Sequence, residues 1–503
     1  MPPTGETVRV ETRSGTVRGQ ARPASLAFRG IPYAAAPVGA LRFAAPAPHP
    51  GWDGVRDART NGPTPSLGPV GEGYSIPEPV VAGEEILNLN VFTPGTDARL
   101  PVYVWVHGGS YVGGSPGGPW FDGASFNASG VVVVAITYRL GFEGYGDIPG
   151  APSNRALRDM IAALEWVQEN IARFGGDPRQ VTLGGQSAGG GAVLALLAAP
   201  AAAGLFRAAV CHSGPLPDID VATAARVGRE LASACGVEHS VHGWREVPRP
   251  AIVAAERATG AADLVSALTN LHRMLAGVEP VTTFGPVLDG DLLPTSGAEL
   301  LECDPSVPLL LGTTSHEFNL VTAPIERYLA RGVGGAVLMG MGLAPRLARA
   351  YPRAFPQWSP AELLGQAVTG RVFRIPAVRV AMAREAQARG RTWMWDFRWR
   401  SPVSGRAVHC VDLPFAWGRL EAERVRRIAG PHPPDELARE MHAALVAFIA
   451  GAHAPWPAFG LDAPVGQVWD SPSWTARDPY RFERIAAEVV GYAGPATERS
   501  TTA

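Results

Sequence analysis

The sequence predicts an α/β protein with a large, mostly parallel, twisted central sheet that is flanked by helices. From residue 86 onward, apolar runs typical of buried strands alternate with segments of helical periodicity. No internal repeat or charge block divides the 503-residue chain. Such alternation places helices on both faces of a mostly parallel sheet. We therefore expect a single domain spanning residues 1–503, with mainly helical insertions around residues 221–300 and 320–390.

The elements follow from local patterns. Short β-ribbons are expected over residues 6–29, a long Gly/Pro-rich surface loop over residues 60–83 and a turn over residues 175–180. Runs rich in β-branched and aromatic residues predict strands at residues 86–94, 100–109, 131–139, 181–183, 307–314 and 392–400. Apolar positions at helical spacing predict helices at residues 156–174, 190–199 and 434–449, with residues 221–371 mainly helical.

Composition excludes several chemistries. The chain has no lysine, so all 44 basic residues are arginine, and Schiff-base, Walker A and Ser-x-x-Lys mechanisms are excluded. A net charge of -2 argues against a nucleic-acid partner. Four cysteines lack metal-type spacing and are too few for a disulfide scaffold, and we find neither a signal-peptide core nor a membrane-length apolar run. We therefore expect no metal, no cofactor, no membrane partner and a cytoplasmic location.

Two Gly-x-Ser-x-Gly motifs occur, at residues 113–117 and 185–189. The second lies between a strand-like run and a helix-like run, which is the context of a nucleophile elbow. In that turn a serine hydroxyl is exposed beside the positive end of a helix, and small neighbours relieve the crowding. Pro116 and glycine follow Ser115, with no helix to begin there. Ser187 is the predicted nucleophile, and Ser115 the predicted structural turn.

A glycine-rich loop directly follows the strand-like residues 100–106. Acyl transfer needs backbone N–H donors from such a loop and from the residue after the nucleophile. Gly108, Gly109 and Ala188 occupy those positions. His107 is expected to bond the loop backbone and not to react.

The predicted base is a histidine that follows the serine and an acid along the chain. That order leaves four of the eleven histidines: His409, His432, His442 and His453. His409 is preferred because it follows a strand across a short loop, with His453 as the alternative. Glu317, just past a strand end, is the predicted acid, and its competitors are Asp289, Asp291 and Asp412.

As a set, these segments resemble the type-B carboxylesterases, the carboxylesterase/cholinesterase family of α/β-hydrolases. The resemblance covers about residues 8–490, and its motifs lie at residues 28–43, 84–94, 107–115, 138–141, 166–190, 311–318 and 409–418. It implies an α/β-hydrolase fold and the same triad and oxyanion residues that were chosen above. It also implies a supporting hydrogen bond from Ser213 and a structural ion pair between Arg42 and Glu84.

The chain departs from the family pattern beside the nucleophile. Gln186 stands where the family usually has Glu, which removes a negative charge and weakens the case for cationic substrates. Ile86 stands where many members have a cysteine, so that family disulfide is absent.

These features predict a serine carboxylic-ester hydrolase that acts on small to medium apolar esters through an acyl-enzyme. Its expected partner is the small-molecule ester, and it is expected to be a monomer or a homodimer. The same triad also serves hydrolysis of amides, carbamates, lactones or thioesters, and transacylation. A non-catalytic binding member of the fold is a further alternative.

Overall fold

The computed structural model describes residues 4–66, 68, 76–259, 264–301, 303–329 and 333–489. Within them, a 13-stranded sheet forms the centre of the molecule. Its strands are β1 Thr7–Thr12, β2 Gly15–Arg22, β3 Ser25–Pro32, β4 Val55–Asp57, β5 Asn88–Thr93, β6 Leu100–Val106, β7 Val132–Ile136, β8 Gly176–Gln186, β9 Ala208–His212, β12 Leu309–Thr314, β13 Thr392–Phe397, β14 Val465–Trp469 and β15 Trp474–Arg477. A separate two-stranded sheet pairs β10 (Ile219–Asp220) with β11 (Val287–Leu288).

The strand order is β1-β2-β3-β5-β7-β6-β8-β9-β12-β13-β14-β15, with β4 beside β2. At one edge of the sheet the pairs β1–β2, β2–β3, β3–β5 and β5–β7 are antiparallel. At the other edge, β15 is antiparallel to β14. Between them, the run from β7 to β14 is parallel throughout. The predicted large, mostly parallel sheet is therefore confirmed, and so are the N-terminal β-ribbons.

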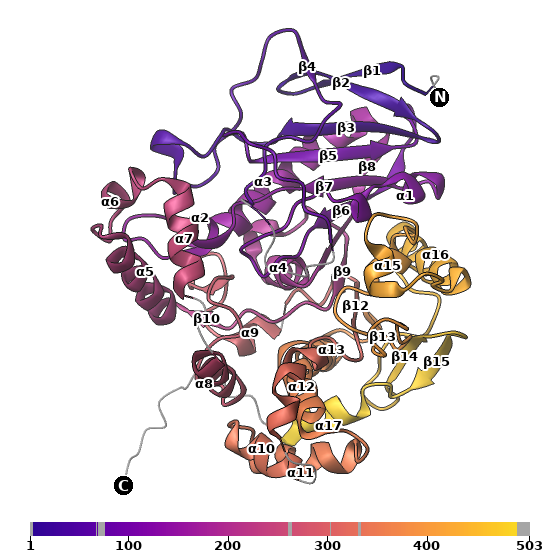
Figure 1. Ribbon diagram of the computed structural model, residues 1–503. Helices are drawn as coiled ribbons and strands as arrows, with labels where there is room; N and C mark the ends of the chain where they lie inside the picture. The colour runs from indigo at the N-terminus through magenta and orange to yellow at the C-terminus, as the bar shows by residue number, and fades with distance from the viewer. Residues whose placement is uncertain are drawn as a thin grey trace.

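Helices occupy the connections between the strands. They are α1 Ala124–Ala128, α2 Gly141–Tyr145, α3 Arg155–Asn170, α4 Ala188–Leu197, α5 Val221–Cys235, α6 Val241–Arg245, α7 Arg249–Thr259, α8 Leu264–Leu275, α9 Gly297–Leu301, α10 Gly334–Gly340, α11 Pro345–Ala354, α12 Pro360–Thr369, α13 Ile375–Gln387, α14 Leu413–Ala416, α15 Val425–Ala429, α16 Asp435–Gly451 and α17 Arg481–Val489. Figure 1 shows α5, α6 and α7 gathered on one side of the molecule, and α10, α11, α12 and α17 at its lower end. No helix in the described residues is both long enough and apolar enough to cross a bilayer.

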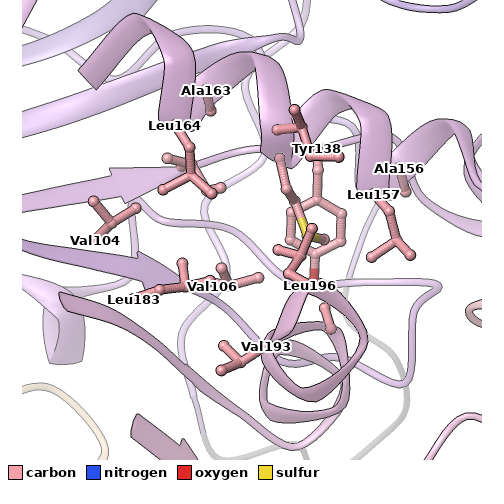
Figure 2. Packing of buried hydrophobic residues seen from close by; sticks show 14 of the residues in the cluster. Val104, Val106, Tyr138, Ala156, Leu157, Ala163, Leu164, Leu183, Val193 and Leu196 are labelled. Atoms are coloured by element: carbon pink, nitrogen blue, oxygen red, sulfur yellow. The ribbon is translucent and has the colours of Figure 1, made fainter. Parts of the chain in front are cut away.

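The central strands bury side chains on both faces because successive residues of a strand point to opposite sides. Val104 and Val106 of β6 pack with Leu164 of α3 and Leu196 of α4 in one cluster of buried residues, as Figure 2 shows. The residue between those two valines, Trp105, belongs to a second cluster. That cluster contains the buried face of α16. The two clusters together cover both faces of β6, and the first also contains Val181 and Leu183 of β8, so the carboxyl ends of these strands extend from the core.

The structure differs from the sequence prediction in the length of β8 and in strands that were not predicted, which are β4, β9, β10, β11, β14 and β15. Residues 176–180, predicted as a turn, belong to β8. The register of β8 against β6 shifts between Leu100 and Val102, so the turn-forming residues form an irregularity within the strand and not a break in it. The sequence of β9, four small apolar residues followed by His212, gives no pattern that separates a strand from a helix. Part of the predicted surface loop at residues 60–83 lies outside the described residues, and its described part contains neither helix nor strand.

Candidate active site

Ser187 lies at a sharp turn between β8 and α4. Its backbone has φ 56° and ψ −125°, a conformation that is costly for a residue other than glycine. Its N–H donates to the carbonyl of His212 at 2.9 Å, which holds the turn against β9. A Cβ atom at Gly189 would lie 2.1 Å from the carbonyl oxygen of Val106, so a larger residue there would break the turn. The half-buried Ser187 side chain is thus presented at the start of α4.

The glycine loop after β6 lies directly against the serine. A Cβ atom at Gly108 would lie 3.1 Å from the Cβ of Ser187, which shows how closely the two residues approach. Gly109 has φ 123°, and its carbonyl accepts from the N–H of Gly113 at 2.9 Å. Within the described residues, the N–H groups of Gly108 and Gly109 donate no hydrogen bond to another protein group. The N–H of Ala188 belongs to the first turn of α4, whose amides have no acceptor inside the helix.

Glu317 lies just beyond β12 and is buried, with 0% of its side chain exposed. One carboxylate oxygen, Oε1, accepts from Ser213 Oγ at 2.6 Å and from the N–H of Thr314 at 2.7 Å. The other, Oε2, lies 2.5 Å from Nδ1 of His409. These bonds fix the carboxylate and confirm the supporting hydrogen bond expected from Ser213.

Nδ1 of His409 contacts the carboxylate of Glu317, and the ring packs against two phenylalanines. Its ring centroid lies 5.0 Å from that of Phe318 and 4.9 Å from that of Phe373. Burial lowers the pKa of His409, but the neighbouring Cys410 and Glu317 outweigh burial and raise that pKa well above its ordinary value. With a proton on Nδ1 for Glu317, the neutral ring has Nε2 as its acceptor.

The Nε2 atom of His409 faces Gln186 in this structure. The side-chain nitrogen of Gln186 lies 3.1 Å from that atom and 3.1 Å from the Sγ of Cys410. Among the described residues, Ser187 Oγ has no hydrogen bond to His409. The structure therefore brings the predicted acid and base together beside the serine, with the amide of Gln186 at the nitrogen that would serve the serine.

His107, Ser115 and His453, the other residues considered in the sequence for the site, make structural contacts and do not join Glu317 and His409. His107 stacks on Tyr138 with ring centroids 4.5 Å apart, its Nδ1 lies 2.8 Å from the carbonyl of Gly108, and burial lowers its pKa to about 4. It is thus a neutral loop residue, as expected. Ser115 is buried and its Oγ accepts from the N–H of Gly117 at 3.1 Å, so it forms the predicted turn. His453 is exposed and bonds the carbonyl of Gly451.

Arg42 does not pair with Glu84, so that expectation is wrong. Its guanidinium contacts Glu143 at 2.8 Å and donates to the carbonyls of Arg245 and Val247. The ion pair thus ties the N-terminal region to α2 and to the end of α6.

Three cavities lie along the site. One of about 330 Å³ is lined by Glu317 and His409, and a second of about 480 Å³ shares the side chain of Phe318 with it. A third, of about 370 Å³, shares Val281 with the second and reaches Ser110 at the glycine loop. One cavity therefore adjoins the acid and the base, and another adjoins the glycine loop at Ser110, while Ser187 lines none of the three.

Comparisons with known proteins identify the family of the chain. Residues 6–329 match the model of the carboxylesterase family. The chain is 33% identical to the para-nitrobenzyl esterase of Bacillus subtilis (strain 168) over 94% of this chain and 97% of that protein. It is 30% identical to the phenmedipham hydrolase of Pseudarthrobacter oxydans, over 95% and 98% of the two chains. A solved carboxylesterase of Geobacillus stearothermophilus superposes with a TM-score of 0.81 at 32% identity, over 95% of this chain and 99% of that one. The chain therefore belongs to the carboxylesterase family and is a carboxylic ester hydrolase of the α/β-hydrolase fold.

Proposed function

We propose that this enzyme hydrolyses esters with Ser187 as nucleophile, His409 as general base and acid, and Glu317 as the residue that orients His409. The observation that carries the proposal is the 2.5 Å contact between Glu317 Oε2 and His409 Nδ1 beside the strained serine turn. A carboxylate in that place selects the tautomer in which Nε2 accepts a proton, and it stabilises the imidazolium that forms.

The reaction starts when the amide of Gln186 moves off Nε2 and the hydroxyl of Ser187 takes its place. Oγ attacks the ester carbonyl carbon while its proton passes to Nε2 of His409. The carbonyl oxygen becomes an oxyanion, which the N–H groups of Gly108, Gly109 and Ala188 stabilise. Collapse of this intermediate breaks the bond to the alcohol oxygen, which leaves with the proton from Nε2, and the acyl group remains on Ser187.

Water completes the cycle by the same steps. It attacks the acyl carbon and gives a proton to Nε2 of His409. The second oxyanion accepts hydrogen bonds from the same three N–H groups. Its collapse releases the carboxylic acid, and Oγ regains the proton from His409. No metal or cofactor takes part in this scheme.

We propose that the substrates are small to medium apolar esters. The cavities next to the acid–base pair and next to the glycine loop, of about 330 and 370 Å³, support this because their volumes are in the range of small-molecule pockets. Two relatives are named for their action on para-nitrobenzyl and phenmedipham substrates.

The test is the rate of p-nitrophenyl butyrate hydrolysis by a Ser187→Ala variant. We expect kcat to fall by at least about 10³-fold and labelling by a fluorophosphonate to be lost, since the nucleophile is gone. Ser115→Ala is the matched control, because it changes the serine of the other Gly-x-Ser-x-Gly motif, and it should keep both properties. A Ser187→Ala variant with the rate of the unmodified enzyme would overturn the proposal.

A further inference from the structure

A second histidine–carboxylate pair lies buried behind the site. Nδ1 of His212 is 3.1 Å from Oδ2 of Asp412, and the two side chains are only 2% and 0% exposed. The residues are 200 positions apart in the chain. His212 is the last residue of β9, and Asp412 immediately precedes α14. No step of the proposed reaction uses either side chain.

His212 is attached to the nucleophile turn. Its carbonyl accepts the N–H of Ser187 at 2.9 Å, and it pairs with Gln186 on one side and Gly312 on the other. The next residue, Ser213, donates to the carboxylate of Glu317 at 2.6 Å. The end of β9 therefore contacts both the serine and the acid through neighbouring residues.

Asp412 is attached to the loop of the base. It lies three residues after His409. Its carbonyl accepts a hydrogen bond from the N–H of Ala416 at 2.9 Å, and this is the first hydrogen bond of α14. Cys410, between them, has φ 69° and its carbonyl accepts from the N–H of Leu413 at 3.2 Å. This loop is thus a tight turn that leads into a short helix, and its position relative to β9 depends on contacts across the molecule.

The pair is surrounded by aromatic rings. The ring of His212 has its centroid 6.0 Å from that of Trp105 and 5.2 Å from that of Trp395. In a buried, apolar environment a hydrogen bond to a carboxylate is strong, and removing one partner leaves the other buried and unsatisfied. The bond between His212 and Asp412 is therefore suited to hold two segments in register.

We propose that His212 and Asp412 are positioning residues that lock the loop of His409 to the end of β9, so that Nε2 of His409 is held at the right distance from Ser187 Oγ. The inference rests on the proposed function of Ser187 and His409. The pair forms one link between the two halves of the reacting geometry: the N–H of Ser187 bonds the His212 backbone, the His212 ring bonds Asp412, and Asp412 leads along the chain to His409. A displacement of about 1 Å between nucleophile and base costs about 10²-fold in rate.

The test compares His212→Ala and Asp412→Ala with conservative variants that keep the hydrogen bond. In His212→Asn the amide N–H replaces Nδ1–H, and in Asp412→Asn the amide oxygen replaces Oδ2. With p-nitrophenyl butyrate, and with rates divided by the fluorophosphonate-titrated concentration of active sites, we expect the alanine variants to lose about 10- to 100-fold in kcat with KM changed by less than about threefold. The asparagine variants should recover most of that loss. The double alanine variant should be no slower than the slower single one, because either change breaks the same bond.

His239→Ala is the matched control. It removes another histidine–aspartate contact, to Asp147 at 3.3 Å, whose two side chains are 15% and 25% exposed and contact none of the proposed catalytic residues. The proposal is overturned if the alanine variants keep the kcat of the unmodified enzyme per titrated site, or if the asparagine variants are as slow as the alanine variants while folded. If the alanine variants do not fold, the asparagine variants decide alone: a kcat within about threefold of the unmodified enzyme supports the proposal, and a larger loss rejects it. Failure of the fluorophosphonate to label Ser187 in the unmodified enzyme would instead reject the proposed function.

Discussion

The Nε2 atom of His409 and the side-chain nitrogen of Gln186 lie 3.1 Å apart. With Nδ1–H directed to Glu317, Nε2 is an acceptor and the amide of Gln186 is its donor. A glutamate at position 186 could not donate and would instead favour the protonated ring. Gln186 thus favours the neutral imidazole that general-base catalysis requires, at the cost of competing with Ser187 for the same nitrogen.

Replacing Gln186 by glutamate should move the pH dependence of catalysis. A carboxylate next to Nε2 raises the pKa of His409. As the pH is lowered, the neutral base is therefore protonated at a higher pH than in the unmodified enzyme, and the midpoint of the acid limb of kcat/KM shifts to higher pH. We expect a shift of about one pH unit, which corresponds to about 1.4 kcal/mol. The measurement is kcat/KM for a neutral p-nitrophenyl ester between pH 5 and pH 10. Gln186→Met controls for the loss of the amide without a new charge, and an unchanged midpoint in Gln186→Glu would contradict the prediction.

Replacing Glu317 by glutamine should move the same limb in the opposite direction. Glu317 helps to raise the pKa of His409 above its ordinary value, so the unmodified enzyme should gain activity as the pH rises through a midpoint above 6.5. Removing the negative charge lowers that pKa, and the midpoint should fall. The plateau of kcat should also drop by about 10⁴-fold, because the glutamine no longer holds the required tautomer. Glu421→Gln, at an exposed ion pair with Arg419, should leave both quantities unchanged.

Adding a methyl group at Gly108 should damage the oxyanion site. The new Cβ would lie 2.7 Å from Oε1 and 2.8 Å from the backbone oxygen of Gln186, so the loop must move away from the serine. Loss of one oxyanion donor costs about 10²- to 10³-fold in kcat. We expect a Gly108→Ala loss of that size, measured with p-nitrophenyl butyrate. Gly95→Ala is the control, because no atom lies within 4 Å of a Cβ there, and a Gly108→Ala variant as fast as this control would refute the assignment of the loop.

Removing Arg139 should destabilise the fold. Its guanidinium contacts Asp159 at 2.7 Å, with 2% and 0% of the two side chains exposed. In Arg139→Met the carboxylate of Asp159 is left buried and unpaired, which costs about 3 to 5 kcal/mol in the free energy of unfolding. Urea denaturation measures the change. Arg439→Met breaks an exposed contact with Glu436 and should leave the stability nearly the same, and equal stability of the two variants would contradict the prediction.

Much of the site could be predicted from the sequence, because the requirements of the elbow are local. Only glycine fits at positions 185 and 189 on the two sides of Ser187, and the glycine loop must approach it closely, so both features are visible as motifs. Chain order and the positions after strands predict Glu317 and His409, although the contact between them depends on the packing of β12 and β13 side by side.

What the sequence by itself determined is the class of fold, the strained serine turn and the helix after it, since these depend on sterics and periodicity over a few residues. Tertiary structure alone decided the partners of side chains that lie far apart along the chain: Glu143 for Arg42, His409 for Gln186 and Asp412 for His212. Local chemistry alone would allow any of several acidic residues or histidines to form these hydrogen bonds and ion pairs. The choice was made by the register of the central strands and the packing between them, which bring particular side chains within bonding distance and bury them there.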